Sequence, residues 1–228
     1  MKQFDQYASQ YTTVLAKNLR FIPGGTEYYN QNRVRITKRV IKNTPLPSPK
    51  RILDFGGGIG LSIPHLKAEF PAADISICDA SSESVKVAHK AHPDIEVLDP
   101  HGLHANYFDL IFVAGVVHHV QPSHRMELLA RIINSLAVGG TLILHELNPL
   151  NPVTRRLVAC CPFDDDAILI SKAELIRSLD SLEGVRLIHE GFSVFLPPLL
   201  HPLSRIERLL SWCPLGAQYF VALTRTRS

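Results

Sequence analysis

The sequence predicts an α/β fold built on a seven-stranded, mainly parallel sheet. Short apolar runs alternate with helical patterns along the chain, which is typical of βαβ units. A glycine-rich turn directly follows the first apolar run, and 228 residues are enough for one large domain. Seven segments have the length and composition of strands, namely 51–55, 74–78, 95–98, 110–114, 140–145, 185–189 and 219–224.

The helices expected between these strands begin and end at recognisable residues. Residues 1–43 have helical patterns and should form an N-terminal helical cap, joined to the first strand by a stiff segment with three prolines. Further helices are expected at 58–70, 82–91, 123–136 and 171–182. Pro71 and Pro93 should stop the first two of these, and Gly139-Gly140 the third.

Composition and charge exclude several functional classes. The 24 Lys and Arg exceed the 21 Asp and Glu by only three charges, and no basic stripe for nucleic acid is present. The most apolar stretch, 192–203, is too short to be a transmembrane segment and contains three prolines. The first ten residues lack the apolar core of a secretory signal, and the four cysteines form no CxxC pair. We therefore expect a cytoplasmic protein.

The strongest signal for a ligand is the turn Asp54-Phe-Gly56-Gly-Gly58-Ile-Gly60, where an apolar strand runs into a helix. A dinucleotide fingerprint, GxGxxG, would need a third glycine where Leu61 stands, which disfavours a nicotinamide oxidoreductase. An acid beside bare backbone N–H groups instead suits a ligand that carries an ammonium and a carboxylate, with Asp54 facing the ammonium. A tight turn with Asp54 as a solvated cap is the plainer alternative.

The pattern Asp-x-Gly-x-Gly-x-Gly at 54–60 resembles the first motif of the class I S-adenosylmethionine-dependent methyltransferases, which have a Rossmann-like, doubly wound sheet. The segments 108–119 and 139–144 resemble the fourth-strand and fifth-strand motifs of the same family, so the resemblance covers 50–147. Outside that span, the segment 4–11 resembles the N-terminal helix of many members, and 148–156 resembles a bacterial subgroup. The resemblance implies S-adenosyl-L-methionine as cofactor and a single domain, 1–228, with acceptor-side elements at 148–228.

Four further residues are expected near the cofactor. Asp79 ends the second strand 19 residues after Gly60, near the spacing of about 20 at which a carboxylate meets ribose hydroxyls, although an acid there also suits a helix start. Ala80 should then pack beside the adenine. The resemblance implies that Asp99 meets the adenine amino group, although Asp99-Pro100 is also an ordinary turn start. It also implies that Tyr11 closes over the cofactor.

Acceptor chemistry should lie beyond the fourth and fifth strands, because ligands of open α/β sheets bind at the carboxyl ends of strands. His119 is the first candidate for a general base and Glu146 the second, and a packed histidine is an equal alternative for His119. No metal is expected, because the adjacent rings of His118 and His119 should point apart and no Cys or carboxylate stands at ligand spacing beside them.

The function expected is methyl transfer to an oxygen, nitrogen or carbon of a small-molecule or lipid-like acceptor. The absence of Asn-Pro-Pro-Tyr after the fourth strand argues against methylation of DNA amines. The apolar segment 193–216 could cover the acceptor pocket, touch a membrane surface peripherally, or pack against the sheet. A cofactor-binding scaffold without catalysis and a nicotinamide oxidoreductase are the alternative functions, and no oligomeric state follows from the sequence.

Overall fold

The computed structural model describes residues 25–45, 47–161, 164–196, 207 and 209–226. Its centre is a seven-stranded sheet in the order β3-β2-β1-β4-β5-β7-β6, in which only β7 is antiparallel to its neighbours. The predicted fold class is confirmed. The strands are β1 (Arg51–Phe55), β2 (Asp74–Cys78), β3 (Glu96–Val97), β4 (Phe108–Ala114), β5 (Leu136–Leu147), β6 (Val185–Ser193) and β7 (Gln218–Arg225).

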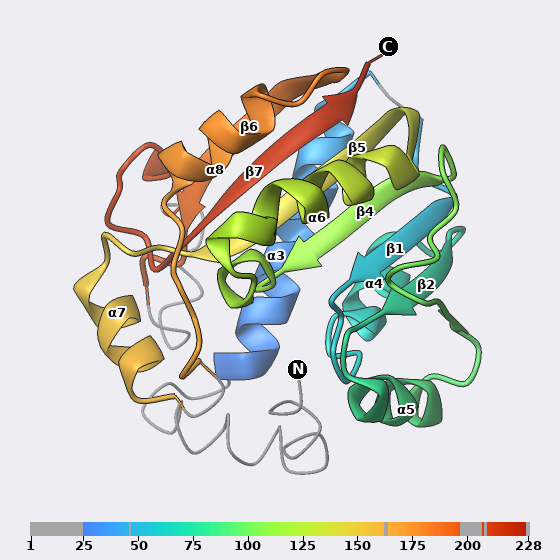
Figure 1. Cartoon of the computed structure of the whole chain (residues 1–228), viewed down its shortest axis with the longest axis horizontal. Helices are drawn as coiled ribbons and strands as arrows, with labels where there is room; N and C mark the ends of the chain where they lie inside the picture. The colour runs from blue at the N-terminus through green and yellow to red at the C-terminus, as the bar shows by residue number, and fades with distance from the viewer. Residues whose placement is uncertain (1–24, 46, 162–163, 197–206, 208, 227–228) are drawn as a thin grey trace.

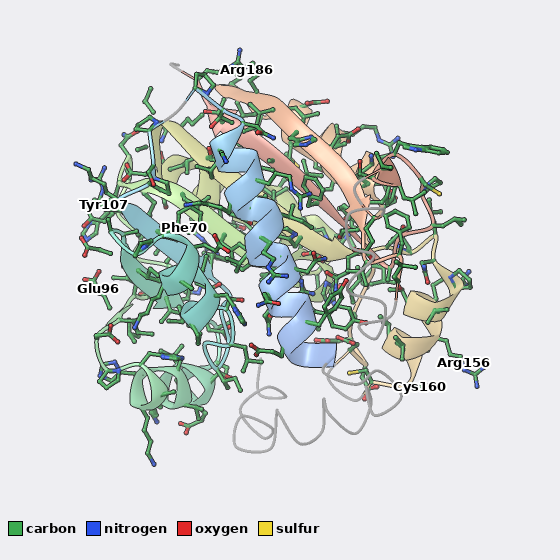
Figure 2. The ribbon with its side chains drawn as sticks, turned by 180° about the vertical axis from the view of Figure 1, so that it is seen from behind. Phe70, Glu96, Tyr107, Arg156, Cys160 and Arg186 are labelled. Atoms are coloured by element: carbon green, nitrogen blue, oxygen red, sulfur yellow. The ribbon has the colours of Figure 1, made fainter. Side chains whose placement is uncertain are left out.

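Helices cover both faces of the sheet (Figure 1). One face packs against α6 (Pro122–Ser135) and α8 (Lys172–Asp180), which bury leucines and isoleucines among the side chains of β4, β5 and β7. The other face packs against α3 (Gly25–Lys42), α4 (Ile63–Glu69) and α5 (Ser82–Ala91). Figure 2 shows α3 running over the middle of the sheet on this side, beside α4, and its buried residues belong to the fold's core.

Local signals explain where several helices begin. The Ser81 hydroxyl accepts a hydrogen bond from the Ser84 N–H and caps α5, which spans the predicted 82–91. At α8, Ser171 and Glu174 form a reciprocal capping box. The helix expected at 58–70 begins only at Ile63, because the glycine turn before it has positive φ angles that no helix can contain.

Two expectations about the elements after β4 are wrong. The helix α6 ends at Ser135 and β5 begins at once, so Gly139 and Gly140 lie inside a strand instead of stopping a helix. A register shift between β4 and β5 accommodates them. None of the helices expected from the sequence lies between β5 and residue 171, yet this segment contains α7 (Pro152–Ala159), which Asn151 caps by accepting a hydrogen bond from the Thr154 N–H. None of the described helices is long and apolar enough to cross a membrane.

Candidate active site

A cavity of about 680 Å³ opens at the carboxyl ends of β1, β2 and β4. Its walls come from α3, the glycine turn after β1, the segment that joins β2 to α5, the segment after β4, and the first turns of α6. This is the position at which ligands of doubly wound sheets bind. The cavity therefore lies at the edge of the sheet at which the sequence predicted the site.

The glycine turn is held by β2 and shaped for close approach to a ligand. The N–H groups of Gly56 and Gly57 donate to the carbonyl of Cys78, at 2.8 and 3.2 Å. Gly56 has φ +70°, and a Cβ on it would lie 2.4 Å from a methyl group of Val116. Gly56 and Gly58 line the cavity, as expected. Gly60 lies behind it, where a Cβ would meet the Cβ of Ala88 in α5 at 3.2 Å, so its role is packing.

Asp54 presents a buried carboxyl group to the cavity. The residue is 1% exposed and its Oδ2 atom has no hydrogen-bond partner among the described residues. Burial and the charge of Asp79 raise its pKa to about 7, against the opposing effect of Arg33. Because an unpaired buried carboxylate is costly, a ligand cation is the natural partner for it. These features fit a ligand with an ammonium group.

Asp79 is a helix-start acid that also faces the cavity. Its Oδ1 atom accepts a hydrogen bond from the Ser81 N–H at 2.8 Å, as a helix-start acid does, and its Oδ2 atom accepts one from the Gly58 N–H at 2.9 Å. The residue nevertheless lines the cavity together with Ala80. Each carboxylate oxygen has a second lone pair, which leaves Asp79 able to accept a hydroxyl of a ligand.

Of the two other residues expected near the cofactor, the structure describes only Asp99. Asp99 is not among the described residues that line the cavity. Its side chain accepts a hydrogen bond from the His101 N–H, and its carbonyl accepts one from the Gly102 N–H, so it starts a turn. The next two residues, Pro100 and His101, do line the cavity, so the expected contact with an adenine amino group stays a prediction. Tyr11 lies outside the described residues.

Sequence reasoning missed the contribution of α3 to the cavity. Arg33 and Asn30 of this helix line it, and the charge of Arg33 acts on Asp54. The Arg33 Nε atom donates to the side chain of Gln218 in β7, at 3.0 Å, which fixes the guanidinium. One sequence feature could have indicated this contribution. Polar residues recur at helical spacing, on a face that otherwise buries apolar residues, at Asn30, Arg33 and Thr37.

Glu146 and His118 form a buried pair behind the cavity wall, 1% and 3% exposed. The Glu146 carboxylate lies 2.6 Å from the His118 Nδ1 atom and accepts hydrogen bonds from the N–H groups of Val116 and Val117. Burial alone would lower the pKa of His118, but the charges of Glu146 and Asp164 raise it to about 9. Glu146 is not among the described cavity-lining residues, so it positions the turn η1 (Val117–His119) and its base role is not supported.

His119 lines the cavity, as expected. Its ring centroid lies 4.1 Å from that of His118, so the expectation that these adjacent rings point apart is wrong. Both rings turn toward the segment that precedes α8, where the His119 Nε2 atom is 3.5 Å from Asp164 Oδ1 and its Nδ1 atom 3.4 Å from Asp166 Oδ1. Burial and the neighbouring His118 charge lower the pKa of His119 despite these carboxylates.

Comparison with known proteins agrees with this geometry. A family profile described as a methyltransferase domain matches residues 28–195, more than half of the chain. A trans-aconitate 2-methyltransferase of Methylobacterium nodulans is 29% identical over 137 residues, which are 57% of this chain and 51% of the relative. The chain thus spans about half the length of this curated relative.

Solved structures share the fold at low sequence identity. A S-adenosylmethionine-dependent methyltransferase from Archaeoglobus fulgidus has a TM-score of 0.65 and 16% identity, covering 95% of this chain and all of the other. The plantazolicin methyltransferase BpumL, solved with SAH, has a TM-score of 0.66 and 17% identity, covering 98% and 94%. The family match and the site together show that the chain belongs to the methyltransferase domain family, within the class I S-adenosylmethionine-dependent methyltransferases.

Proposed function

We propose that the chain transfers a methyl group from S-adenosylmethionine to a small-molecule acceptor. The observation that carries this proposal is the buried, unpartnered oxygen of Asp54 beside a glycine turn that leaves room for a ligand. A Cβ on Gly57 would lie 2.7 Å from the Asp54 carboxyl carbon, so only glycine leaves that carboxyl group undisturbed. The turn and the acid are thus one structure suited to an amino-acid-bearing nucleoside.

The chain's own residues would bind and orient this cofactor. Asp54 would accept the ammonium group, Arg33 would pair with the carboxylate, and Asp79 would accept the ribose hydroxyls, with Ala80 beside the adenine. When bound, the cofactor supplies a methyl group already activated by its sulfonium. The protein then has mainly to align the two reactants, a contribution of up to about 7–11 kcal/mol.

The size and lining of the cavity favour a small acceptor. Its volume of about 680 Å³ lies within the range of roughly 300–1,000 Å³ typical of small-molecule sites, and it must hold the cofactor as well. The trans-aconitate and plantazolicin methyltransferases among the similar proteins are named for acceptors that are not nucleic acids. A lipid-like acceptor stays an alternative that experiment can distinguish.

The role of His119 as a general base stays a prediction. The ring lines the cavity, which is a requirement for contact with the acceptor. An acceptor without a proton to lose would need no base, so methyl transfer itself does not depend on this role. Glu146 would act only through the turn that it holds, as a positioning residue.

The function can be tested with methyl-labelled S-adenosylmethionine and cell extract separated into small-molecule, lipid and macromolecular fractions. We expect label in the small-molecule fraction. The Asp79→Ala variant should lose this labelling, whereas Asp74→Ala, at the opposite end of β2, should keep it. Label in the lipid or macromolecular fraction would overturn the acceptor class, and cofactor binding without labelling of any fraction would favour a non-catalytic scaffold.

A further inference from the structure

Three side chains without a role in the binding of the cofactor converge beside the cavity, and one of them, His119, lines it. His118 and His119 lie on η1, and Asp164 lies in the segment between α7 and α8. Each offers a ligand atom within 4.8 Å of the others. The two imidazole Nε2 atoms lie 3.8 and 3.5 Å from the same oxygen, Asp164 Oδ1.

These separations suit a shared ion better than direct hydrogen bonds. Hydrogen bonds between N–H and O are about 2.7–3.2 Å long, which is shorter than both distances. Two atoms that each lie about 2.1 Å from a tetrahedral zinc ion are about 3.4 Å apart. Both distances from Asp164 to the imidazoles are therefore close to the ligand spacing of a metal site.

A carboxylate lies behind each imidazole ring, at hydrogen-bond distance for His118 and at a longer distance for His119. His118 Nδ1 lies 2.6 Å from Glu146 Oε2, and His119 Nδ1 lies 3.4 Å from Asp166 Oδ1. A carboxylate that accepts the Nδ1 proton leaves Nε2 as the ring atom that can bind a metal, which there takes the place of the Nε2 proton. This carboxylate–histidine arrangement typically supports metal-ligating histidines; the His118–Glu146 pair has it at 2.6 Å, and Asp166 lies near enough to His119 to complete a second one.

Hydrogen bonds hold the segment that carries Asp164 against η1. The N–H of Ile168 donates to the carbonyl of His118 at 2.8 Å. The buried guanidinium of Arg125 in α6 donates both to the carbonyl of Val120, at 2.9 Å, and to the carbonyl of Ile168. The three ligand atoms thus come from segments that are tied together beside the cluster, which lowers the cost of bringing them to one ion.

We propose that His118, His119 and Asp164 bind a divalent transition-metal ion of the zinc class. Two imidazoles and one carboxylate are a ligand set that zinc accepts, and they leave a fourth position for water or another oxygen. His119 and Asp166 line the cavity, so this position borders the acceptor space. An ion that holds an acceptor oxygen is a consequence that rests on the proposed function, whereas metal binding itself does not.

The metal site gives His119 a different role from the one expected from sequence. An imidazole whose Nε2 lone pair binds a metal cannot also take a proton from the acceptor through that atom. A cluster without metal would instead be an ion-pair chain through His118, with His119 left for the base role. The two arrangements predict opposite results in a binding experiment.

The full-length protein, stripped with EDTA and dialysed, should be titrated calorimetrically with zinc chloride in the absence of cofactor. We expect one saturable equivalent, and we expect His119→Ala and Asp164→Asn to weaken it at least tenfold. Asp166→Asn should weaken it about 10- to 100-fold, as loss of a supporting carboxylate does. The matched controls Asp165→Asn, in the same segment, and His124→Ala, an exposed histidine at the cavity, should bind zinc like the wild type.

Cobalt absorption provides a second measurement that reports on the ligand geometry. Cobalt chloride should give the visible bands of a tetrahedral site in the wild type and lose them in Asp164→Asn. Absence of saturable zinc binding would overturn the proposal, as would binding that neither His119→Ala nor Asp164→Asn changes. Calorimetry with S-adenosylmethionine on the same stripped protein tests the cofactor site separately, so failure of one proposal is distinguishable from failure of the other.

Discussion

The carboxylate of Asp79 accepts a hydrogen bond from the backbone N–H of Gly58, at 2.9 Å. The end of β2 therefore holds the glycine turn that follows β1, and the acid expected to bind the ribose also shapes the neighbouring part of the site. The same carboxylate accepts the Ser81 N–H at the start of α5. One side chain thus joins three parts of the cavity wall.

Replacing Asp79 with alanine should weaken binding of S-adenosylmethionine by about 1–3 kcal/mol, roughly ten- to a hundredfold in Kd. The loss has two sources, because the ribose hydroxyls lose an acceptor and Gly58 loses the partner of its N–H. Calorimetry should show the change, with Asp74→Ala as control because that exposed acid begins the same strand. An unaltered Kd in Asp79→Ala would leave Asp79 as a helix-start acid only.

Cofactor affinity should rise with pH through about 7, the pKa that burial and the Asp79 charge give to Asp54. Below that pH the carboxyl group is protonated and cannot pair with the ammonium, so affinity should fall by up to about tenfold per pH unit. Calorimetric titrations between about pH 5.5 and 7.5 measure this slope. The Asp54→Asn variant should bind the cofactor more weakly and with an affinity that does not change with pH. An affinity of the wild type that is independent of pH would contradict the pairing of Asp54 with the ammonium group.

The sheet and the glycine turn could be predicted because their signals are local in the sequence. Asp54 and Asp79 each stand at the end of an apolar strand, and the carboxyl ends of parallel strands meet at one edge of a sheet. Their proximity to each other therefore followed from the strand assignments alone. Asp99 shows the limit of such reasoning, since a turn start and a ligand contact have the same local pattern.

The remaining parts of the site depend on contacts between distant segments. Asp164 lies near His118 in a segment that Arg125 and Ile168 hold against η1, and no periodic pattern in the sequence indicates these contacts. Arg33 lies on a helix that seemed only a cap. A polar residue on the buried face of a helix could have indicated a functional role. That Arg33 acts on Asp54, however, depends on how α3 packs on the sheet, which the sequence does not show.

Replacing Gly56 with alanine should destabilise the fold more than replacing Gly139. Both glycines have positive φ, +70° and +80°, so each variant bears the strain of a left-handed residue, about 1–2 kcal/mol. Only at Gly56 would the new Cβ meet another atom, a methyl group of Val116 at 2.4 Å, whereas nothing lies within 4 Å at Gly139. Overpacking should add about 1–3 kcal/mol to the cost at Gly56.

Urea unfolding of the two glycine variants measures this difference. Both variants bear the same backbone strain, so the difference between their free energies of unfolding reports the clash with Val116. Equal unfolding midpoints would mean that Val116 moves aside at no cost. That result would also argue that the segment after β4 is not held as tightly as its hydrogen bonds to Glu146 indicate.

His145 should make the folded protein sensitive to acid. The side chain is fully buried, its Nε2 atom lies 3.1 Å from the Thr37 hydroxyl, and its Nδ1 atom has no partner among the described residues. Burial and the nearby Arg33 charge hold the pKa of His145 well below its usual value. The unfolded chain, with a histidine pKa of about 6.5, therefore binds a proton before the folded state does, and stability should fall as the pH falls below about 6.5.

The His145→Phe variant isolates this contribution. The Thr37 hydroxyl already donates to the carbonyl of Arg33, so losing the imidazole leaves no donor without a partner, and Phe112 and Phe220 flank the site with apolar rings. The free energy of unfolding, measured by urea titration between about pH 5 and 7.5, should decline less steeply with acid in the variant than in the wild type. Because Asp54 titrates in both proteins, the difference between the two curves reports His145 alone, and parallel curves would show that this imidazole becomes protonated inside the fold as readily as in the unfolded chain.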